Sequence, residues 1–342
     1  MLRKKMLKPA IMAVGLILII LLSANSYFAF VGVKAIINAI AVIGIVVISG
    51  YANQLHLGQS AFIGLGAYVS AILVTKLGVN FWLTVPCSIV VAGIVGWLLS
   101  IPTLRLKGGS YLALVTQCFG EIVYILLLNL ESITNGAFGI LGIPSPRIGP
   151  LVFSDLRSYL FLCLAFLILV YVVVKRILNS KYGRFFKSIK EAEEAAQSVG
   201  IHTRKYKMIA FVLATSIAGI AGALYGPYIG YLSPEQFRWS ASLTLVGMAI
   251  VGGLSSVEGG ILGSVLLTFL PELLRSADQL RMILYGLVII LSLAFIPNGL
   301  ISLFGKSRAE LAGMMRNRLK ELTRHSTRKS GLTKHEKSKE ET

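Results

Sequence analysis

The amino-acid sequence predicts an all-α fold, a polytopic transmembrane helical bundle with about ten spans, and three observations support this prediction. Of the 342 residues, 55% are hydrophobic and only 14% are charged, whereas average soluble domains carry roughly 25% charged residues. Apolar runs of roughly 16 to 22 residues recur along the chain, and each approaches or crosses a hydrocarbon core of about 30 Å. Glycine-rich polar segments interrupt two of these runs, as in helices covered by protein at membrane depth.

Ten apolar segments are expected to cross the bilayer within one transmembrane domain, residues 1–305. The first segment follows a basic N-terminus and has the pattern of a secretory signal, but the many later segments favour an uncleaved span. The expected spans are 9–25, 28–49, 59–76, 81–101, 111–130, 156–174, 207–229, 240–254, 258–275 and 281–299.

Clusters of positive charge set the expected orientation of these spans. Basic residues gather at the N-terminus, in the link Arg105–Lys107, in a polar island from Lys175 to Lys207, and after Lys306. Lysine and arginine beside apolar spans are typical of cytoplasmic loops. Both termini and the island are therefore expected in the cytoplasm, and the loop 131–155 outside. This distribution also argues that the net charge of +18 reflects membrane topology and not nucleic-acid binding.

Residues 306–342 form a basic polar tail that is too polar to bury a core. A short amphipathic or frayed helix followed by a disordered segment is expected there. On the cytoplasmic side, such a tail would be attracted to the lipid surface of the inner leaflet.

The two interrupted segments predict a weak internal repeat. Gly44 and Gly50 are six residues apart, as are Gly247 and Gly253, and a further glycine group follows each pair. Corresponding broken segments in two halves of a chain point to a transport path, whereas close helix packing is the alternative. Glu121 lies inside a span, and two roles are open for it: a direct part in the transport path, or a hydrogen bond between helices. The candidate path residues are Tyr51, Asn53, Gln54, His56, Gln59, Ser60, Glu121, Gly252 and Gly253.

No catalytic or metal-binding pattern is found in the sequence. A phosphate-binding loop of the form Gly-x-x-x-x-Gly-Lys-Ser/Thr is absent, so the chain is not expected to bind ATP by that route. The three cysteines, Cys87, Cys118 and Cys163, lie in apolar segments without the spacing of metal ligands, as buried structural cysteines do.

The polar island is expected to contain one helix, from Arg184 to Val199. Gly200 can end this helix in a left-handed turn. A charged face opposite an apolar stripe suits insertion into a groove of another protein, and a position on the inner leaflet is the alternative. The stripe is formed by Phe185, Ile189, Ala192, Ala196 and Val199, which recur at three- and four-residue steps.

Glu194-Ala195-Ala196-x-x-x-Gly200 resembles the EAA loop of ABC importer permeases. The longer run from Tyr182 to Tyr225 is similar to the branched-chain amino acid permeases, and within them to the LivM-type subunit. Further similar stretches are Gly50-Tyr51-Ala52-x-Gln54-Leu55-x-Leu57-Gly58, Ala61-Phe62-x-Gly64-x-Gly66-Ala67-Tyr68, Phe119-Gly120-Glu121-Ile122, Gly252-Gly253-x-x-Ser256-x-x-Gly259 and Tyr285-Gly286.

The resemblance covers about 35 to 300 and has clear departures. Asn135-Gly136-Ala137-Phe138-Gly139 stands where the family often has Gly-Gly-x-Asn-Gly, Asn53 where glycine is usual, and His56 where a small or plain polar residue is usual. These departures leave the exact substrate open: branched-chain or other hydrophobic amino acids, or alternatively urea, short amides or other amino acids. A sugar permease, a stand-alone secondary carrier or a membrane scaffold is a more distant alternative.

The resemblance implies a non-enzymatic permease subunit of an ATP-driven importer in a bacterial or archaeal plasma (inner) membrane, working by alternating access. Its implied partners are two cytoplasmic ATPase subunits, which carry the ATP and Mg, a second homologous permease subunit, and an extracytoplasmic amino-acid-binding protein. The chain itself would bind no cofactor. The implied ATPase-coupling residues are Arg184, Lys187, Glu191, Glu194, Ala195, Ala196 and Gly200.

Overall fold

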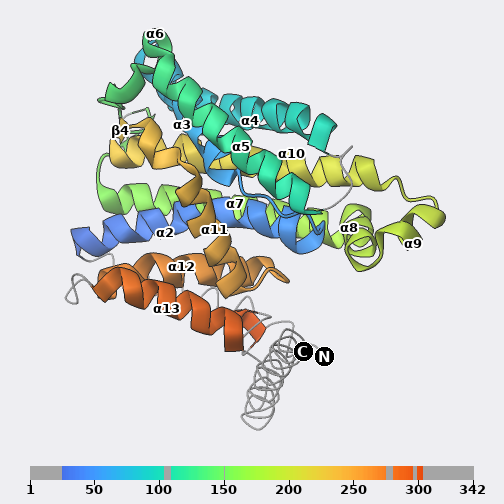
Figure 1. Cartoon of the computed structure of the whole chain (residues 1–342). Helices are drawn as coiled ribbons and strands as arrows, with labels where there is room; N and C mark the ends of the chain where they lie inside the picture. The colour runs from blue at the N-terminus through green and yellow to red at the C-terminus, as the bar shows by residue number, and fades with distance from the viewer. Residues whose placement is uncertain (1–24, 104–108, 150, 275–279, 296–298, 303–342) are drawn as a thin grey trace, which may run out of the picture.

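The computed structural model describes residues 25–103, 109–149, 151–274, 280–295 and 299–302. The expected first span, 9–25, lies outside this part of the chain except for its last residue, and so does the basic tail 306–342. Within the described residues the protein is an elongated bundle of helices (Figure 1).

The long helices of the described residues follow one another along the chain. The first is α2 (Ser26–Ile45), which continues directly into a π-helical turn, η1 (Val46–Tyr51). The remaining long helices are α3 (Gln59–Thr75), α4 (Phe81–Thr103), α5 (Gly109–Asn129), α7 (Leu156–Asn179), α10 (Thr203–Ile229), α11 (Trp239–Gly252), α12 (Val257–Leu273) and α13 (Leu280–Phe295).

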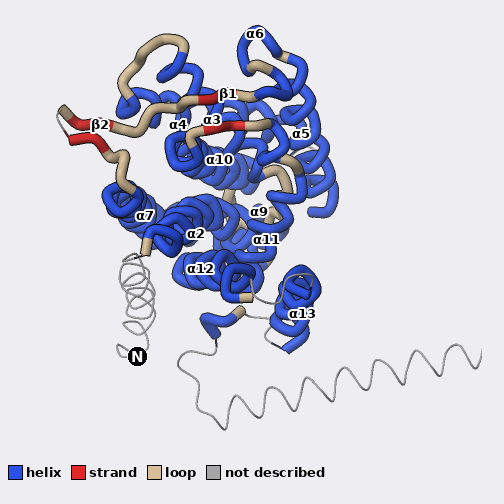
Figure 2. Tube along the Cα trace, turned by 90° about the vertical axis from the view of Figure 1, so that its left-hand side faces the viewer, coloured by secondary structure: helices blue, strands red, loops and turns tan. Residues whose placement is uncertain are grey.

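Short elements close the two ends of the bundle. At one end lie α6 (Glu131–Thr134), η2 (Gly136–Phe138) and η3 (Pro234–Phe237), and at the opposite end lie α8 (Lys181–Glu191) and α9 (Glu193–Ser198) (Figure 1). Two small antiparallel sheets lie in the connections: β1 (Ile140–Leu141) pairs with β4 (Tyr231–Leu232), and β2 (Arg147–Ile148) pairs with β3 (Leu151–Val152) (Figure 2). A last turn, η5, covers Leu300–Ser302.

The all-α membrane class is confirmed by the apolar helices. In the described part of the chain, five helices are long and apolar enough to cross a bilayer, or six if the helices on either side of Gly253, bent by 120°, form one broken span. The helices α3 and α13 are shorter, at 17 and 16 residues. The count of ten spans and the internal repeat stay predictions.

The helix α2 is the buried centre of the bundle. Its sequence from Val31 to Ile48 is almost entirely alanine, glycine, valine and isoleucine, and nearly all of these residues are buried. A helix that is hydrophobic on all sides needs neighbours on all sides, and α7, α10, α11 and α12 surround it (Figure 2). By contrast, α4, α5 and α7 expose large apolar side chains such as Leu98, Leu114 and Leu169, as helices facing lipid do.

Glycines allow three helices to contact one another through their backbones. A Cβ atom at Gly219 on α10 would lie 2.5 Å from the carbonyl oxygen of Ser88 on α4, and one at Gly66 on α3 would lie 2.5 Å from the carbonyl oxygen of Gly219. Ser88 adds a hydrogen bond by donating to the carbonyl oxygen of Gly66 at 2.9 Å. Small residues at helix crossings permit this close approach in membrane proteins.

The close α3–α10 packing predicts the effect of one methyl group. Gly222→Ala should lower the free energy of unfolding by about 1–3 kcal/mol through overpacking, because the new Cβ would overlap the Ile63 carbonyl oxygen. Gly120→Ala is the control, since nothing lies within 4 Å of a Cβ there, and alanine favours a helix over glycine by about 1 kcal/mol. Thermal unfolding in detergent measures both, and equal midpoints would contradict this packing.

Candidate functional site

The polar island folds into two helices, not one. The expectation of a continuous helix from Arg184 to Val199 is wrong, because Ala192 is extended, with φ −156° and ψ 99°, and separates α8 from α9. The break lets Ile189 and Ala196 both be buried, whereas Val199 is 76% exposed and leaves the expected apolar stripe. Two acidic residues, Glu193 and Glu194, open α9, where the helix dipole favours negative charge.

The chain leaves α9 through a left-handed turn at Gly200, as the sequence predicts. Gly200 has a φ of +84°, and Ile201 donates a backbone hydrogen bond to Ala196 at 3.0 Å. This bond closes the end of α9 in the manner of glycine-terminated helices and returns the chain to α10.

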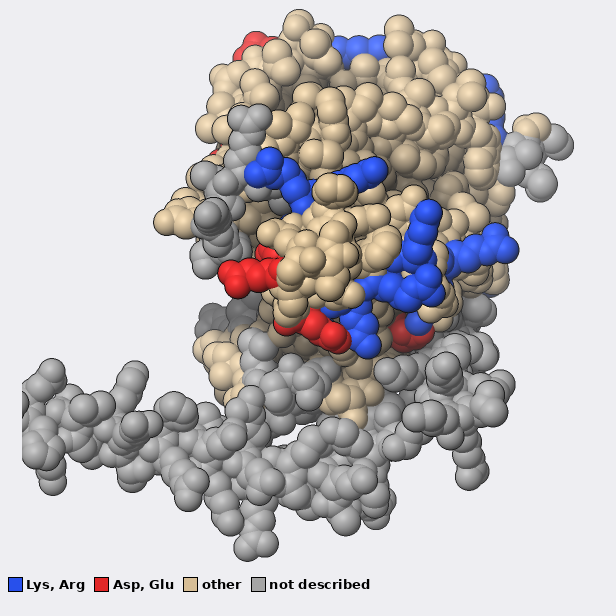
Figure 3. All heavy atoms as spheres, turned by 90° about the vertical axis from the view of Figure 1, so that its right-hand side faces the viewer, with Lys and Arg blue, Asp and Glu red and all other residues tan. Residues whose placement is uncertain are grey.

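Most of the expected coupling residues lie on the surface of this helix pair. Ala196 is buried, and the other six, Arg184, Lys187, Glu191, Glu194, Ala195 and Gly200, are exposed. Acidic and basic side chains gather on this end of the molecule (Figure 3), and Tyr182 and Val199 are exposed there as well. The surface therefore offers both charge and apolar area to a partner.

The helix α8 is fixed to the transmembrane body at two points. The fully buried side chain of Phe186 packs with Ala52 and Ala210. The Nζ of Lys190 donates a hydrogen bond to the carbonyl oxygen of Gly50, in η1, at 2.6 Å. Because η1 continues α2, this bond attaches α8 to the end of the central helix of the bundle.

A second anchor joins α9 to α10. The Nζ of Lys207 lies 2.6 Å from Glu193 Oε2, and Lys207 is partly buried, whereas the pair Lys187–Glu191 is exposed and 3.9 Å apart. Exposed pairs of that kind stabilise little, and Lys187–Glu191 lies within α8. The Lys207 ion pair is therefore the one that holds α9 to α10.

The interrupted segment after η1 is irregular, as the sequence predicts, but most of its polar residues point into packed interior. Gln54, His56 and Gln59 are buried. The His56 ring lies 5.7 Å from the Phe62 ring and 5.1 Å from the Phe211 ring, centroid to centroid.

The remaining residues of the segment lie at its borders. Gln59 donates to the carbonyl oxygen of Ala41 at 2.9 Å, which fixes the start of α3 against α2. Tyr51 is half-buried and Asn53 is exposed, in the left-handed region with φ +53°.

The other candidate path residues lie in two separate places. Glu121 is half-buried on α5. Gly252 and Gly253 lie where backbones nearly touch: a Cβ on Gly252 would meet the Gly259 carbonyl and, at 2.9 Å, the Gly263 nitrogen. Close helix packing, the alternative interpretation of these glycines, accounts for this geometry.

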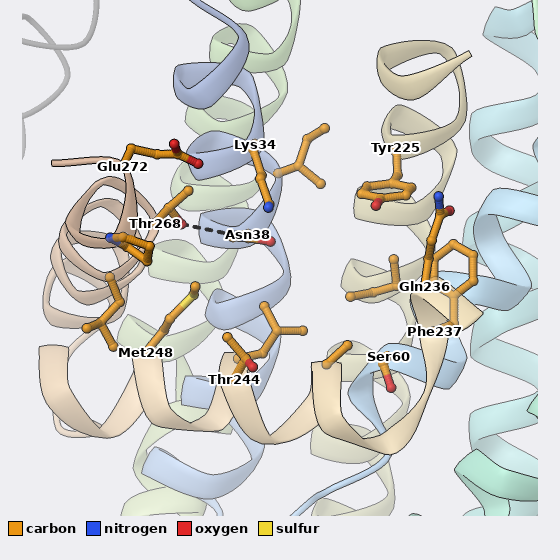
Figure 4. A pocket seen from close by; sticks show the side chains of 16 residues that line it. Lys34, Asn38, Ser60, Tyr225, Gln236, Phe237, Thr244, Met248, Thr268 and Glu272 are labelled. Atoms are coloured by element: carbon orange, nitrogen blue, oxygen red, sulfur yellow. Dashed lines mark hydrogen bonds between the residues drawn. The ribbon is translucent and has the colours of Figure 1, made fainter. Parts of the chain in front are cut away.

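A pocket of about 430 Å³ opens between α2, α3, α10, η3, α11 and α12 (Figure 4). Of the candidate path residues, Ser60 lies in its wall, where its hydroxyl is 2.6 Å from that of Ser242. The lining consists of Lys34, Ile37, Asn38, Ser60, Ile63, Tyr225, Gln236, Phe237, Ala241, Thr244, Leu245, Met248, Leu267, Thr268, Pro271 and Glu272.

Apart from Ser60, sequence reasoning missed the polar residues of this lining, although one signal was available. Lys34 and Asn38 are four residues apart in an otherwise apolar span, so they share one face of a helix. The opposing residues Thr268 and Glu272 also share a face, on α12, and Asn38 donates to Thr268 Oγ1 at 3.1 Å. Two polar pairs at this spacing on facing helices mark the pocket.

An ion pair links α7 to the start of α12. Lys175 Nζ lies 2.6 Å from Glu258 Oε1, and the Tyr171 hydroxyl donates to the same oxygen at 3.0 Å. The Glu258 side chain is 4% exposed and that of Lys175 32% exposed. The preceding Ser256 caps α12 by accepting from Gly259 N at 3.1 Å. The helix that leads into α8 is thereby tied to a wall of the pocket.

The ion pair predicts strong coupling between its two residues. Lys175→Met should lower the free energy of unfolding by about 2–4 kcal/mol, because it leaves a buried carboxylate uncompensated, with a reduction for the partial exposure of Lys175. Lys175→Met combined with Glu258→Gln should recover most of the loss, because no unpaired charge is then buried. A double-mutant cycle on the detergent-solubilised protein measures the coupling, and additive losses would contradict it.

The chain is similar along most of its length to known transport proteins. The family described as branched-chain amino acid transport system, permease component, matches residues 27–293. The high-affinity branched-chain amino acid transport system permease protein LivM of Escherichia coli is 36% identical over 282 residues, which cover 76% of this chain and 66% of that protein, just under two thirds.

More distant relatives have the same description. The probable branched-chain amino acid transport permease protein LivM of Methanocaldococcus jannaschii is 25% identical over 319 residues, 84% of this chain and 90% of that protein. The permease protein LivH of the Escherichia coli high-affinity system is 24% identical over 284 residues, 77% of this chain and 90% of that protein.

Proposed function

The chain belongs to the family of permease components of branched-chain amino acid transport systems, and from that premise we propose that it is the LivM-type permease subunit of an ATP-driven importer. Its cargo would be branched-chain or similar hydrophobic amino acids. It would reside in a bacterial or archaeal plasma membrane with both termini and the α8–α9 pair in the cytoplasm. The basic island supports this orientation.

The observation that carries the proposal is the attachment of α8 to η1. The helix pair carries exposed charged side chains (Figure 3) and the exposed Val199, and Lys190 bonds it to the backbone of Gly50. An ATPase that docks on α8 and α9 would therefore pull on the central helix whenever it closes around ATP. The chain has no phosphate-binding loop of its own, so this partner would supply the nucleotide site and the Mg.

Alternating access would use two breaks in the helices of the bundle, which would move in response to the docked ATPase. At η1 the chain leaves regular helix before α3, and at Gly253 the helices α11 and α12 meet at 120°. Such breaks let two parts of a transporter rock against each other about a central site. ATP binding would favour one of the two arrangements, and hydrolysis would return the other.

A complete importer would contain further chains. The relatives include both LivM- and LivH-type permease proteins, which supports a pair of similar permease subunits. Two ATPases would engage the two coupling helix pairs, and an external binding protein would deliver the amino acid. No nucleic acid enters this arrangement.

The coupling assignment predicts the effect of reversing one charge. In the reconstituted importer, Glu194→Lys should reduce ATP-driven leucine uptake and ATPase co-purification by about tenfold, which corresponds to roughly 1.4 kcal/mol of interface energy. The same change at Glu131, which is exposed on α6 at the opposite end of the bundle, is the control and should alter neither quantity. Normal uptake and co-purification in Glu194→Lys would overturn the assignment.

The same preparation tests the other functions that the family resemblance leaves open. Leucine uptake that proceeds without ATP or ATPase subunits would identify a secondary carrier. Uptake blocked by excess urea or short amides, but not by valine, would identify one of the alternative cargoes.

A further inference from the structure

The pocket between α2 and α12 has an uncommon distribution of charge. Among the described residues its wall is largely apolar, with side chains such as Ile37, Leu245 and Leu267, but it also contains one cation, Lys34, and one anion, Glu272. The two charged residues come from facing helices, and the Lys34 side chain reaches into the space between them (Figure 4). Charged side chains in membrane-spanning segments are costly and mark functional sites.

The two charges are available to a ligand. In the described part of the chain, Lys34 forms no ion pair within 4.0 Å, and its side chain is exposed toward the pocket. The carboxylate of Glu272 is half-buried and accepts a hydrogen bond from the Tyr27 hydroxyl through Oε2. This bond fixes the carboxylate through Oε2, and Oε1 takes no part in it.

The pocket lies far from the α8–α9 pair. Lys34 and Gly50 are separated by 16 positions along α2 and η1, or about 24 Å at 1.5 Å per residue. The site is thus in the half of the bundle opposite the Lys190 contact, the half that would face the outside in the expected orientation. A volume of about 430 Å³ is within the range of about 300–1,000 Å³ typical of small-molecule sites.

We propose that this pocket binds the zwitterion of an α-amino acid with a hydrophobic side chain, with Lys34 receiving the carboxylate and Glu272 the ammonium group. The aliphatic wall of Ile37, Ile63, Leu245 and Leu267 receives the side chain. This inference rests on the proposed function and adds to it the residues that recognise the cargo. An uncharged cargo such as urea would leave Lys34 and Glu272 without an opposite charge, so the pocket discriminates against it.

Protection of a cysteine in the pocket tests this site without the binding protein or ATP. Thr244 lines the pocket and is exposed, so Thr244→Cys is introduced as the reporter. Cys87 and Cys118, which are exposed and not buried as the sequence predicts, are first replaced by serine. L-Leucine should slow the reaction of this cysteine with a maleimide in nanodiscs. Leucinamide, which lacks the carboxylate, and 4-methylpentanoate, which lacks the ammonium group, should each require at least about tenfold more ligand for half-protection.

Charge removal then identifies the contacts. In the Thr244→Cys background, Lys34→Met or Glu272→Gln should raise the leucine concentration for half-protection by about tenfold or more, whereas Lys34→Arg should shift it only about threefold. Lys76→Met is the matched control, because Lys76 is exposed and bonds the Ser132 carbonyl oxygen outside the pocket. Unchanged half-protection in both charge-removing variants would overturn the proposal, and so would protection by added phosphatidylethanolamine but not by leucine.

Failure of this inference and failure of the proposed function give different results. If the importer takes up leucine with ATP but leucine does not protect the cysteine, the pocket is not the cargo site and the proposed function stands. If leucine protects the cysteine but uptake needs no ATPase, the pocket stands and the importer assignment fails. Variants in which leucine no longer protects the cysteine are compared with the Lys76→Met control by thermal unfolding, so that a folding defect is recognised directly.

Discussion

The structure depends on how it satisfies the backbone where α2 ends. Between Val46 and Gln59 the chain leaves the α-helical pattern inside an apolar bundle, and each amide and carbonyl group released there needs a partner within the protein. Ser49 donates to the Gln54 carbonyl at 2.9 Å and Gln54 N–H donates to Ile48 at 3.1 Å. Further partners come from elsewhere in the chain: Thr116 on α5 accepts from Leu57, and Lys190 on α8 donates to Gly50. One irregular segment therefore recruits both a membrane helix and a surface helix.

Much of this architecture could be predicted from the sequence, because apolar length and glycine position report directly on helices and their breaks. The expected limits of the spans from 28–49 to 258–275 agree with the described helices to within several residues. The break at Ala192 could not be predicted, because alanine is a good helix former and its extended conformation results from tertiary packing: Phe186 and Ala196 are both buried against the body.

The site was less predictable than the fold. The sequence indicated the irregular segment after Gly50. The side chains of Gln54 and His56 are buried in the interior of the bundle, and Ser60 is the candidate residue that lines the pocket. Recognising that Lys34 and Glu272 line one pocket requires knowing that α2 and α12 lie side by side, because more than 200 positions separate the two residues in the sequence. The sequence of an apolar helix in a bilayer says little about which helix packs against it, because lipid is as apolar as the side chains of the helix.

The bond from Lys190 to Gly50 has a consequence for how this protein can evolve. Its acceptor is a main-chain oxygen, so no substitution at position 50 can supply a different chemical group there. A larger residue at position 50 is also excluded, because its Cβ would collide with the carbonyl of Leu254. All inherited variation in this contact is therefore confined to the lysine. A lineage that lost the lysine could restore the link only by recruiting a donor from another position, and not by a compensating change at its partner.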